Sequence, residues 1–414
     1  MLDKIRFLLN RVREHLWVKP LFICILSVLG VFVAKIADYY FGTQAFPFIN
    51  TDTVETMLTI LPSSMLAIAV FAVGSMVSAY SDAASTATPR SFPVVVTDDI
   101  SQNALSAFVG AFIFGVVGLI AVKNSYFEPA GRFVLFVITA AVFFIVILTF
   151  LRWVDSIARL GRLNVTIDKV EQVAARALLK RKVMPTLGAK KAPDEMEMDG
   201  VDIYTPEVGY VQRIDVAKLQ QVAKKYDIEI TVMGLPGAFV TSARPIAQLH
   251  VQKTEPVDET DTDSIANAFL ISDDRKFDED PRYGLVILSE IASRALSPAV
   301  NDPCTAIDIT SSQVRLFTMW EHEPSEDEIK YDRIYVPELS MDEMFDDAFN
   351  GIARDGAGLI EVAMRLQKAF KTLSSLGNHD IEEAAKEHAR LAFKYAEAAL
   401  PLDEEIEQLR QVTR

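Results

Sequence analysis

Six residues within the segment 56–82 stand three or four positions apart, the spacing that puts side chains on one face of a helix. They are Ser64, Ala67, Phe71, Ser75, Ser78 and Asp82. Hydroxyl groups on such a face can line a water-filled path for ions, with a carboxylate at one end to set ion preference. Small residues also let a second helix pack closely in a membrane, which is the commoner use of such a face. The face, which includes Ala67, therefore predicts either a helix contact or a pore lining made of Ser64, Phe71, Ser75, Ser78 and Asp82.

The next segment, residues 81–103, carries opposite charges and is expected to be a loop. Arg90 lies between Pro89 and Pro93, and Asp98 comes shortly before the next apolar run. Arg90 and Asp98 would stand at the mouth of any pore, where Arg90 could contact an anion or a lipid headgroup. In the structural alternative, Arg90 forms a salt bridge with Asp98 or with a later part of the chain, and exposed bridges of that kind contribute little stability.

Two helices are predicted on either side of a turn that runs from Ser297 to Asn301. Asp280 and Asp302 each precede a proline, the pattern of an N-cap followed by proline at the first helical position. The first of these helices has apolar residues at helical spacing, with Arg294 near its end. Asp280, Arg294, Ser297, Asn301 and Asp302 are therefore candidates for contacting a ligand or for holding the turn.

Motifs for catalysis and cofactor binding are absent from the sequence. It holds no Walker loop, dinucleotide-binding glycine pattern, nucleophile elbow or zinc-ligand helix. The acidic pairs do not follow the spacing of a calcium-binding loop, so capping or solvated carboxylates are their simpler role. A net charge of -15 disfavours nucleic acid. We expect no enzyme activity, no metal, no cofactor and no nucleic-acid partner.

Four apolar runs cover residues 21–40, 58–80, 104–122 and 133–153. Each has about the 20 residues needed to cross ~30 Å of hydrocarbon, and none has a charge at its centre. Lys35 and Asp38, three apart near the end of the first run, can pair with each other or extend to the membrane interface. Basic residues precede the first run and mark the cytoplasmic side, so both termini are expected in the cytoplasm. These basic residues are Lys4, Arg6, Arg11, Arg13 and Lys19.

Changes in composition divide the chain into seven segments. Residues 1–20 are a basic cytoplasmic N-terminus, 21–153 a four-helix transmembrane domain, and 154–185 a juxtamembrane helix that continues the fourth span. A linker, 186–200, leads to a β-rich module, 201–252, a helical core with the turn, 253–340, and a C-terminal helical hairpin, 341–414. The expected fold class is a membrane protein with a four-helix transmembrane bundle followed by a cytoplasmic α+β region.

The β-rich module alternates short strand-like runs with turns at Gly209, Gly234 and Pro236-Gly237. This pattern resembles the barrel-sandwich modules related to lipoyl and biotinyl domains. The turn at residues 234–237 has no lysine to carry either cofactor. We therefore expect a structural or interaction module.

Several short motifs are similar to the predicted bacterial membrane proteins of the domain-of-unknown-function 2254 family. The run from Ser297 to Pro303 is the specific one, and the resemblance covers nearly the whole chain. It implies four spans and a bacterial inner-membrane location, and it brings no assigned activity. The supporting motifs are Asp274-Arg275, Glu279-Asp280-Pro281, Gly284-Leu285 and Glu290-Ile291-Ala292.

Two functions are compatible with these features. The first is a homo-oligomeric ion channel or gated pore, in which copies of the second span surround a path and the acidic cytoplasmic region is a vestibule or a gate that binds a small ligand. The second is a non-conducting membrane-anchored scaffold or ligand sensor, in which the same stripe only packs. We favour the pore, with the lipid bilayer, further copies of the chain, and ions or a small ligand as its partners.

Overall fold

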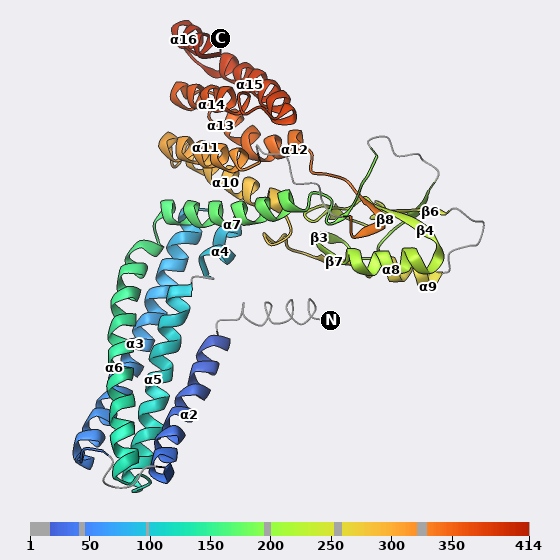
Figure 1. Ribbon diagram of the computed structural model, residues 1–414. Coiled ribbons are helices and arrows are strands. Elements are labelled where there is room, and N and C mark those ends of the chain that lie inside the picture. The colour runs from blue at the N-terminus through green and yellow to red at the C-terminus, as the bar shows by residue number, and fades with distance from the viewer. Residues whose placement is uncertain are drawn as a thin grey trace. The chain divides into compact units, whose positions relative to one another are not determined.

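The computed structural model describes residues 17–40, 46–96, 99–193, 200–251, 259–320 and 329–413 (Figure 1). The chain divides into two compact units, Met1–Thr166 and Ile167–Arg414. The basic residues before Trp17, together with Asp98, lie outside the described residues, so their expected roles stay predictions.

The first unit is helical. Its elements are α2 (Val18–Tyr40), α3 (Thr51–Thr86), the 3-10 turn η1 (Pro89–Ser91), α4 (Phe92–Val96), α5 (Asp99–Lys123) and α6 (Pro129–Leu160). Four helices in the described part of the chain, α2, α3, α5 and α6, are long and apolar enough to cross a membrane, which confirms the four expected spans. Figure 1 shows them running side by side.

Small residues of α5 let its neighbours approach closely. A side chain at Gly115 would lie 2.8 Å from the ring of Pro62 in α3, and one at Gly118 would lie 3.1 Å from Leu58. On its α2 side, a side chain at Gly110 would overlap Ile23. Close packing of this kind stabilises helices where lipid supplies no hydrophobic drive, and it makes α5 the central helix of the bundle.

Residues 81–103, expected to be a loop, are largely helical. Helix α3 continues through Thr86, where the hydroxyls of Ser85 and Thr86 each donate to the carbonyl of Asp82 at 2.9 Å. Pro89 and Pro93 then stand in the first turns of η1 and α4, where a missing N–H is tolerated. Helical starts at prolines therefore replace the expected loop.

The helix expected to continue from the fourth span is interrupted. Helix α6 ends at Leu160, Gly161 is its C-cap, and α7 (Leu163–Val183) begins two residues later. A side chain at Gly161 would lie 3.5 Å from the Cβ of Asp82 in α3. Glycine lets the end of α6 approach α3 here, and the chain starts a separate helix.

The second unit contains most of α7 and two sheets. One has the strand order β1-β8-β4-β6-β2, with β8 parallel to both its neighbours and the other pairs antiparallel. The other is antiparallel with the order β5-β3-β7. The strands are β1 (Ala189–Lys191), β2 (Val201–Ile203), β3 (Gly209–Ile214), β4 (Ile228–Val232), β5 (Phe239–Val240), β6 (Ala247–Val251), β7 (Phe269–Ser272) and β8 (Tyr331–Val336).

These sheets extend beyond the β-rich module expected at residues 201–252, because β1, β7 and β8 come from outside it. Two helices belong with them, α8 (Val216–Tyr226) and α9 (Glu259–Ala266). Asp215 caps α8 by accepting from Lys218 N at 3.0 Å, and α8 buries Val216, Leu219 and Ala223. The architecture is thus α+β with mixed sheets, and the barrel-sandwich likeness stays a prediction.

The remaining helices of this unit form two groups. The central pair consists of α10 (Pro281–Ala295) and α11 (Pro303–Thr318). The C-terminal group has six segments, with a π-helical turn, η2, inside its first run: α12 (Met341–Phe345), η2 (Asp346–Asn350), α13 (Gly351–Asp355), α14 (Ile360–Leu373), α15 (His379–Ala399) and α16 (Asp403–Thr413).

The C-terminal region therefore has more segments than the two helices expected. The first expected helix breaks after Asp355, where Gly356 N donates to Ile352 O at 2.9 Å and a side chain at Gly356 would collide with Val362. The second breaks at Leu400–Pro401, as expected for the residue before a proline. Helices α14 and α15 do pack against each other.

Candidate functional site

Helix α3 presents three faces. One is buried in the bundle, and helical geometry puts an exposed sector roughly a third of a turn to either side of it. The first exposed sector is aliphatic and contains Leu66, Val70, Val73 and Val77. The second is the face noted in the sequence, which we call the α3 stripe: Ser64, Ala67, Phe71, Ser75, Ser78 and Asp82. The structure thus separates a surface suited to lipid from one that is small and partly polar.

Helix α6 covers only one edge of the α3 stripe. The Phe71 ring meets Trp153 edge-on at 6.1 Å, and Asp82 lies beside Gly161. Phe71 nevertheless remains 64% exposed, Ser78 and Asp82 are exposed, and Ser64 and Ser75 are half-buried. Packing inside one chain therefore accounts for only part of the stripe.

Large side chains fill the interior of the bundle. Phe108 and Trp153 are fully buried, and their ring centroids are 6.2 Å apart. Phe150 continues this aromatic cluster at 6.0 Å from Trp153. These rings therefore fill the centre of the bundle at that level.

Of the two residues predicted for the pore mouth, the structure describes Arg90 and does not describe Asp98. Arg90 is exposed within η1, after the end of the stripe. Asp98 lies outside the described residues, so a pair between them stays a prediction. Nearby, the buried Gln102 donates from Nε2 to Val96 O at 3.4 Å, which ties the start of α5 to α4.

The caps predicted for the central helix pair are confirmed. The Asp280 carboxylate accepts from Arg282 N and Tyr283 N, both at 3.2 Å, and Asp302 accepts from Thr305 N at 3.2 Å. Each cap is followed by proline at the start of its helix. Both aspartates therefore have a structural role.

The turn itself is closed by its backbone. Asn301 has φ +51 and donates from its N–H to Ser297 O at 2.8 Å, and Asp302 N donates to Ala295 O at 2.8 Å. Asparagine tolerates this left-handed conformation better than most residues. Arg294 and Asn301 are exposed and Ser297 is half-buried. The candidates at this turn thus lie together at one corner of the central pair.

Asp280 connects this pair to the sheets. Its side chain is 2% exposed, and Arg275 Nε donates to its Oδ2 at 2.7 Å. Burial raises the pKa of Asp280, while the hydrogen bond from Arg275 acts in the opposite direction. Gly237 has φ +94 and packs directly on this carboxylate. The turn at residues 234–237 therefore covers the ion pair between Arg275 and Asp280.

The sequence reading missed Arg181, in the last turn of α7. Its side chain is 4% exposed, and none of its three guanidinium nitrogens has a hydrogen-bond partner among the described residues. Burial lowers its pKa to about 10, against the opposing effect of Glu279, Asp280 and Glu338. The run Lys180-Arg181-Lys182 looks like a solvated basic helix end, so only the fold reveals the burial.

Within the described residues, no group of three or more His, Cys, Asp or Glu side chains is arranged to hold a metal ion. His388 is buried, but its ring nitrogens lie 2.8 Å from Ala384 O and 3.0 Å from the Asp346 carboxylate, so both are used within the C-terminal helices. This histidine has a structural role.

Comparison with known proteins identifies the family. The model of the family described as "Predicted membrane protein (DUF2254)" matches residues 13–372. Uncharacterized proteins of Mycobacterium bovis and Mycobacterium tuberculosis are each 27% identical over 145 residues, which is 34% of this chain and 28% of each relative's length. No solved structure matches the chain. With the family model covering most of its length, and with four membrane-spanning helices followed by an α+β region, the chain belongs to the DUF2254 family of predicted membrane proteins.

Proposed function

We propose that this membrane protein is a homo-oligomeric ion channel or gated pore in which copies of α3 surround the path. The proposal rests on one observation: the residues of the α3 stripe are exposed or half-buried in a single chain, while aromatic side chains fill the interior of the bundle. Serine hydroxyls on the stripe can substitute for part of an ion's hydration, as pore-lining groups do. The aliphatic sector on the other side of α3 suits contact with lipid.

Charge at the end of the stripe would set ion preference. Asp82 is exposed there, and Arg90 follows it after a short turn. A ring of carboxylates from several copies favours cations. The acidic residues of the Ile167–Arg414 unit suit a vestibule that concentrates cations, and ligand contact at the exposed turn between α10 and α11 would make that unit a gate.

Conductance of the purified chain in planar bilayers tests the pore. The wild-type chain is expected to conduct, and Ser75→Leu to abolish conductance by placing an aliphatic side chain on the stripe, with the oligomer size unchanged. Val77→Leu is the matched control, because Val77 is 62% exposed on the aliphatic sector of the same helix. Asp82→Asn should lower the cation preference. A silent wild-type chain, or equal conductance in Ser75→Leu and Val77→Leu, would refute the proposal.

Cytoplasmic placement of the second unit belongs to the same proposal, together with a bacterial inner-membrane location. Cys304 is exposed at the start of α11, and Cys24 is half-buried within the span α2. A membrane-impermeant maleimide should therefore label the chain in inverted membrane vesicles and leave it unlabelled in intact cells. Cys304→Ser should remove the label. Labelling of Cys304 in cells with an intact inner membrane would place this unit outside.

A non-conducting scaffold or ligand sensor is the second candidate. The observation that favours it is the exposed apolar surface of the turn between α10 and α11, where Pro298 and Ala299 are exposed and Val300 is 52% exposed. Such a surface suits a protein partner. An intact oligomer with no conductance across voltages and salts would support this candidate over the pore.

A further inference from the structure

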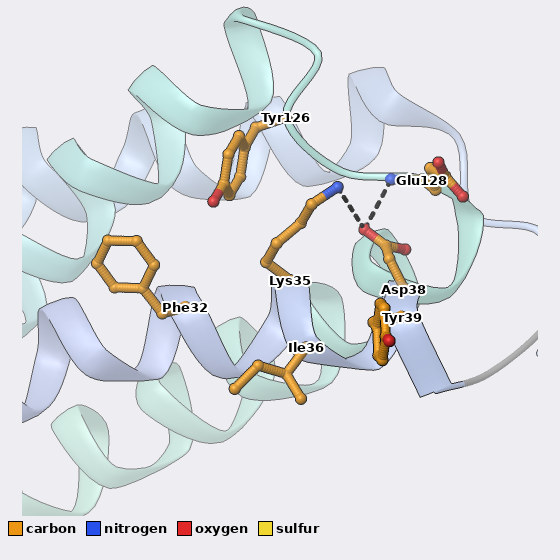
Figure 2. A pocket seen from close by; sticks show the side chains of 7 residues that line it. All are labelled: Phe32, Lys35, Ile36, Asp38, Tyr39, Tyr126 and Glu128. Carbon is orange, nitrogen blue, oxygen red and sulfur yellow. Dashed lines mark hydrogen bonds and ion pairs between the residues drawn. The ribbon is translucent and has the colours of Figure 1, made fainter.

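A pocket of about 520 Å³ opens at the end of the bundle where α2 stops and α6 begins (Figure 2). Its lining comes from Phe32, Lys35, Ile36, Asp38 and Tyr39 of α2, and from Tyr126 and Glu128 in the α5–α6 connection. One wall is apolar and the other carries charge. All of these residues belong to the first unit, so the pocket is formed within one compact body.

Asp38 organises the charged wall. Its side chain is 4% exposed and accepts from the backbone N–H of Glu128 at 2.9 Å and of Gly131 at 2.5 Å. A carboxylate from α2 therefore caps the N-terminus of α6, where free N–H groups and the helix dipole favour negative charge. Gly131 permits the approach, because a side chain there would lie 2.7 Å from the Asp38 carboxyl carbon.

The same carboxylate positions Lys35. The Lys35 ammonium lies 3.6 Å from the Asp38 carboxylate, so of the two roles open to these residues the structure shows the pair, and it lies 5.1 Å from the centre of the Tyr126 ring. Figure 2 shows it pointing between these two groups. An ammonium carries three donors, and these are the two contacts that the described residues make with it. The Lys35 side chain is 36% exposed, so it can also donate to a group that enters the pocket.

The pocket lies at the level of lipid headgroups. Trp17 at one end of α2 is 61% exposed, and Tyr39 at the other is 86% exposed, as in the aromatic belts of membrane helices. The helix between them is about 33 Å long at ~1.5 Å per residue, close to the ~30 Å thickness of the hydrocarbon. Phe32, three residues before Lys35 toward the hydrocarbon, and Ile36, the next residue after Lys35, are both about half exposed.

We propose that this pocket binds a zwitterionic phospholipid whose headgroup carries a primary ammonium. Its phosphate would accept from Lys35, its ammonium would contact the Glu128 carboxylate and the Tyr39 ring, and an acyl chain would lie along Phe32 and Ile36. The charge balance selects this occupant: one lysine and two carboxylates line the pocket, so a lipid with a net negative headgroup meets excess negative charge.

Native mass spectrometry of the full chain in detergent micelles tests the proposal with dioleoyl phosphatidylethanolamine and dioleoyl phosphatidylglycerol, which share phosphate and acyl chains. The ethanolamine lipid should be retained more tightly. Lys35→Met should weaken retention of both lipids on the order of tenfold, as expected for losing one charge-assisted contact. Glu128→Gln should weaken only the ethanolamine lipid and so remove the preference.

Two controls distinguish lipid binding in the pocket from other effects of the substitutions. Lys123→Met removes a lysine that pairs with Glu55 at 3.0 Å, and it should leave retention unchanged. Lys35→Arg keeps the charge and should retain the lipid, which separates lost binding from lost folding. Equal loss in Lys35→Met and Lys123→Met, or glycerol lipid held as tightly as ethanolamine lipid, would overturn the proposal. Displacement of the lipid by millimolar inorganic phosphate would overturn it in favour of a soluble anion.

Discussion

Gly284 lies on α10 where that helix meets α7, and its missing side chain lets the two helices touch. A Cβ at this position would overlap the Cβ of Ala174 and lie 3.0 Å from its Cα. Ordinary contact between carbon atoms needs about 3.5–4.0 Å. Both atoms of Ala174 are fixed to a helix backbone, so the side chain cannot rotate away and Gly284→Ala must move the helices apart.

The expected cost follows from two opposing effects. Overpacking of this kind costs about 1–3 kcal/mol, and the upper end applies because no flexible side chain can yield. Replacing glycine by alanine inside a helix returns about 1 kcal/mol. We expect Gly284→Ala to destabilise the second unit by about 2 kcal/mol, or to lower its melting temperature by about 4–8 °C for a unit of this size.

Thermal unfolding of the full chain in detergent measures the effect. The control is the double variant Ala174→Gly/Gly284→Ala, which moves the methyl group from α7 to α10 and keeps the contact volume. It should recover most of the lost stability, since the propensity changes at the two sites nearly cancel. A single variant as stable as the wild type, or a double variant no better than the single, would show that the helices do not meet at Gly284.

Three further predictions concern charge and backbone in the second unit. Hydrogen bonds from Arg315 and Ser312 outweigh the effect of burial and lower the pKa of Glu171, so its contribution is present above the ordinary carboxyl pKa and lost in acid. Glu171→Gln should cost about 0.5–1 kcal/mol at neutral pH and nothing in acid, measured by denaturant unfolding across pH; a constant difference would contradict this. Arg181→Met should stabilise the unit by about 1–3 kcal/mol, because a buried guanidinium that has no hydrogen bond to the described residues is replaced by an apolar side chain. The advantage should shrink above pH 10, where the lowered pKa of Arg181 lets it lose its charge in the folded state; a loss of stability would mean that water or a ligand pairs with Arg181. Gly237→Ala should cost about 2–4 kcal/mol from its positive φ and its contact with Asp280, and less in an Asp280→Ala background, as a double-mutant cycle of melting temperatures would show.

Local chemistry explains the predictions that the structure confirms. The four spans follow from apolar runs of about 20 residues, since hydrocarbon leaves a chain little choice but a helix. The caps at Asp280 and Asp302 follow from an aspartate placed directly before proline, a signal contained in a few adjacent residues.

Features that depend on contacts between distant segments of the chain have no comparable signal in the local sequence. Residues 331–336 fall within the segment predicted as a helical core, yet they form β8, which lies between β1 and β4 in the larger sheet. Parallel pairing joins residues far apart in sequence, so no local pattern identifies the partners. The α3 stripe was recognised, but which of its edges α6 covers depends on the packing of Phe71 against Trp153.

The sequence alone therefore determined the spans, the helix starts and the turn between α10 and α11, because each depends on neighbouring residues and on the solvent they prefer. Only the tertiary structure decided that Arg181 is buried without a hydrogen bond to any described residue, that Asp38 caps α6, and that a charged pocket opens beside Lys35. Burial and pairing of a charge depend on what other parts of the chain bring to it, and that information is not contained in any one segment.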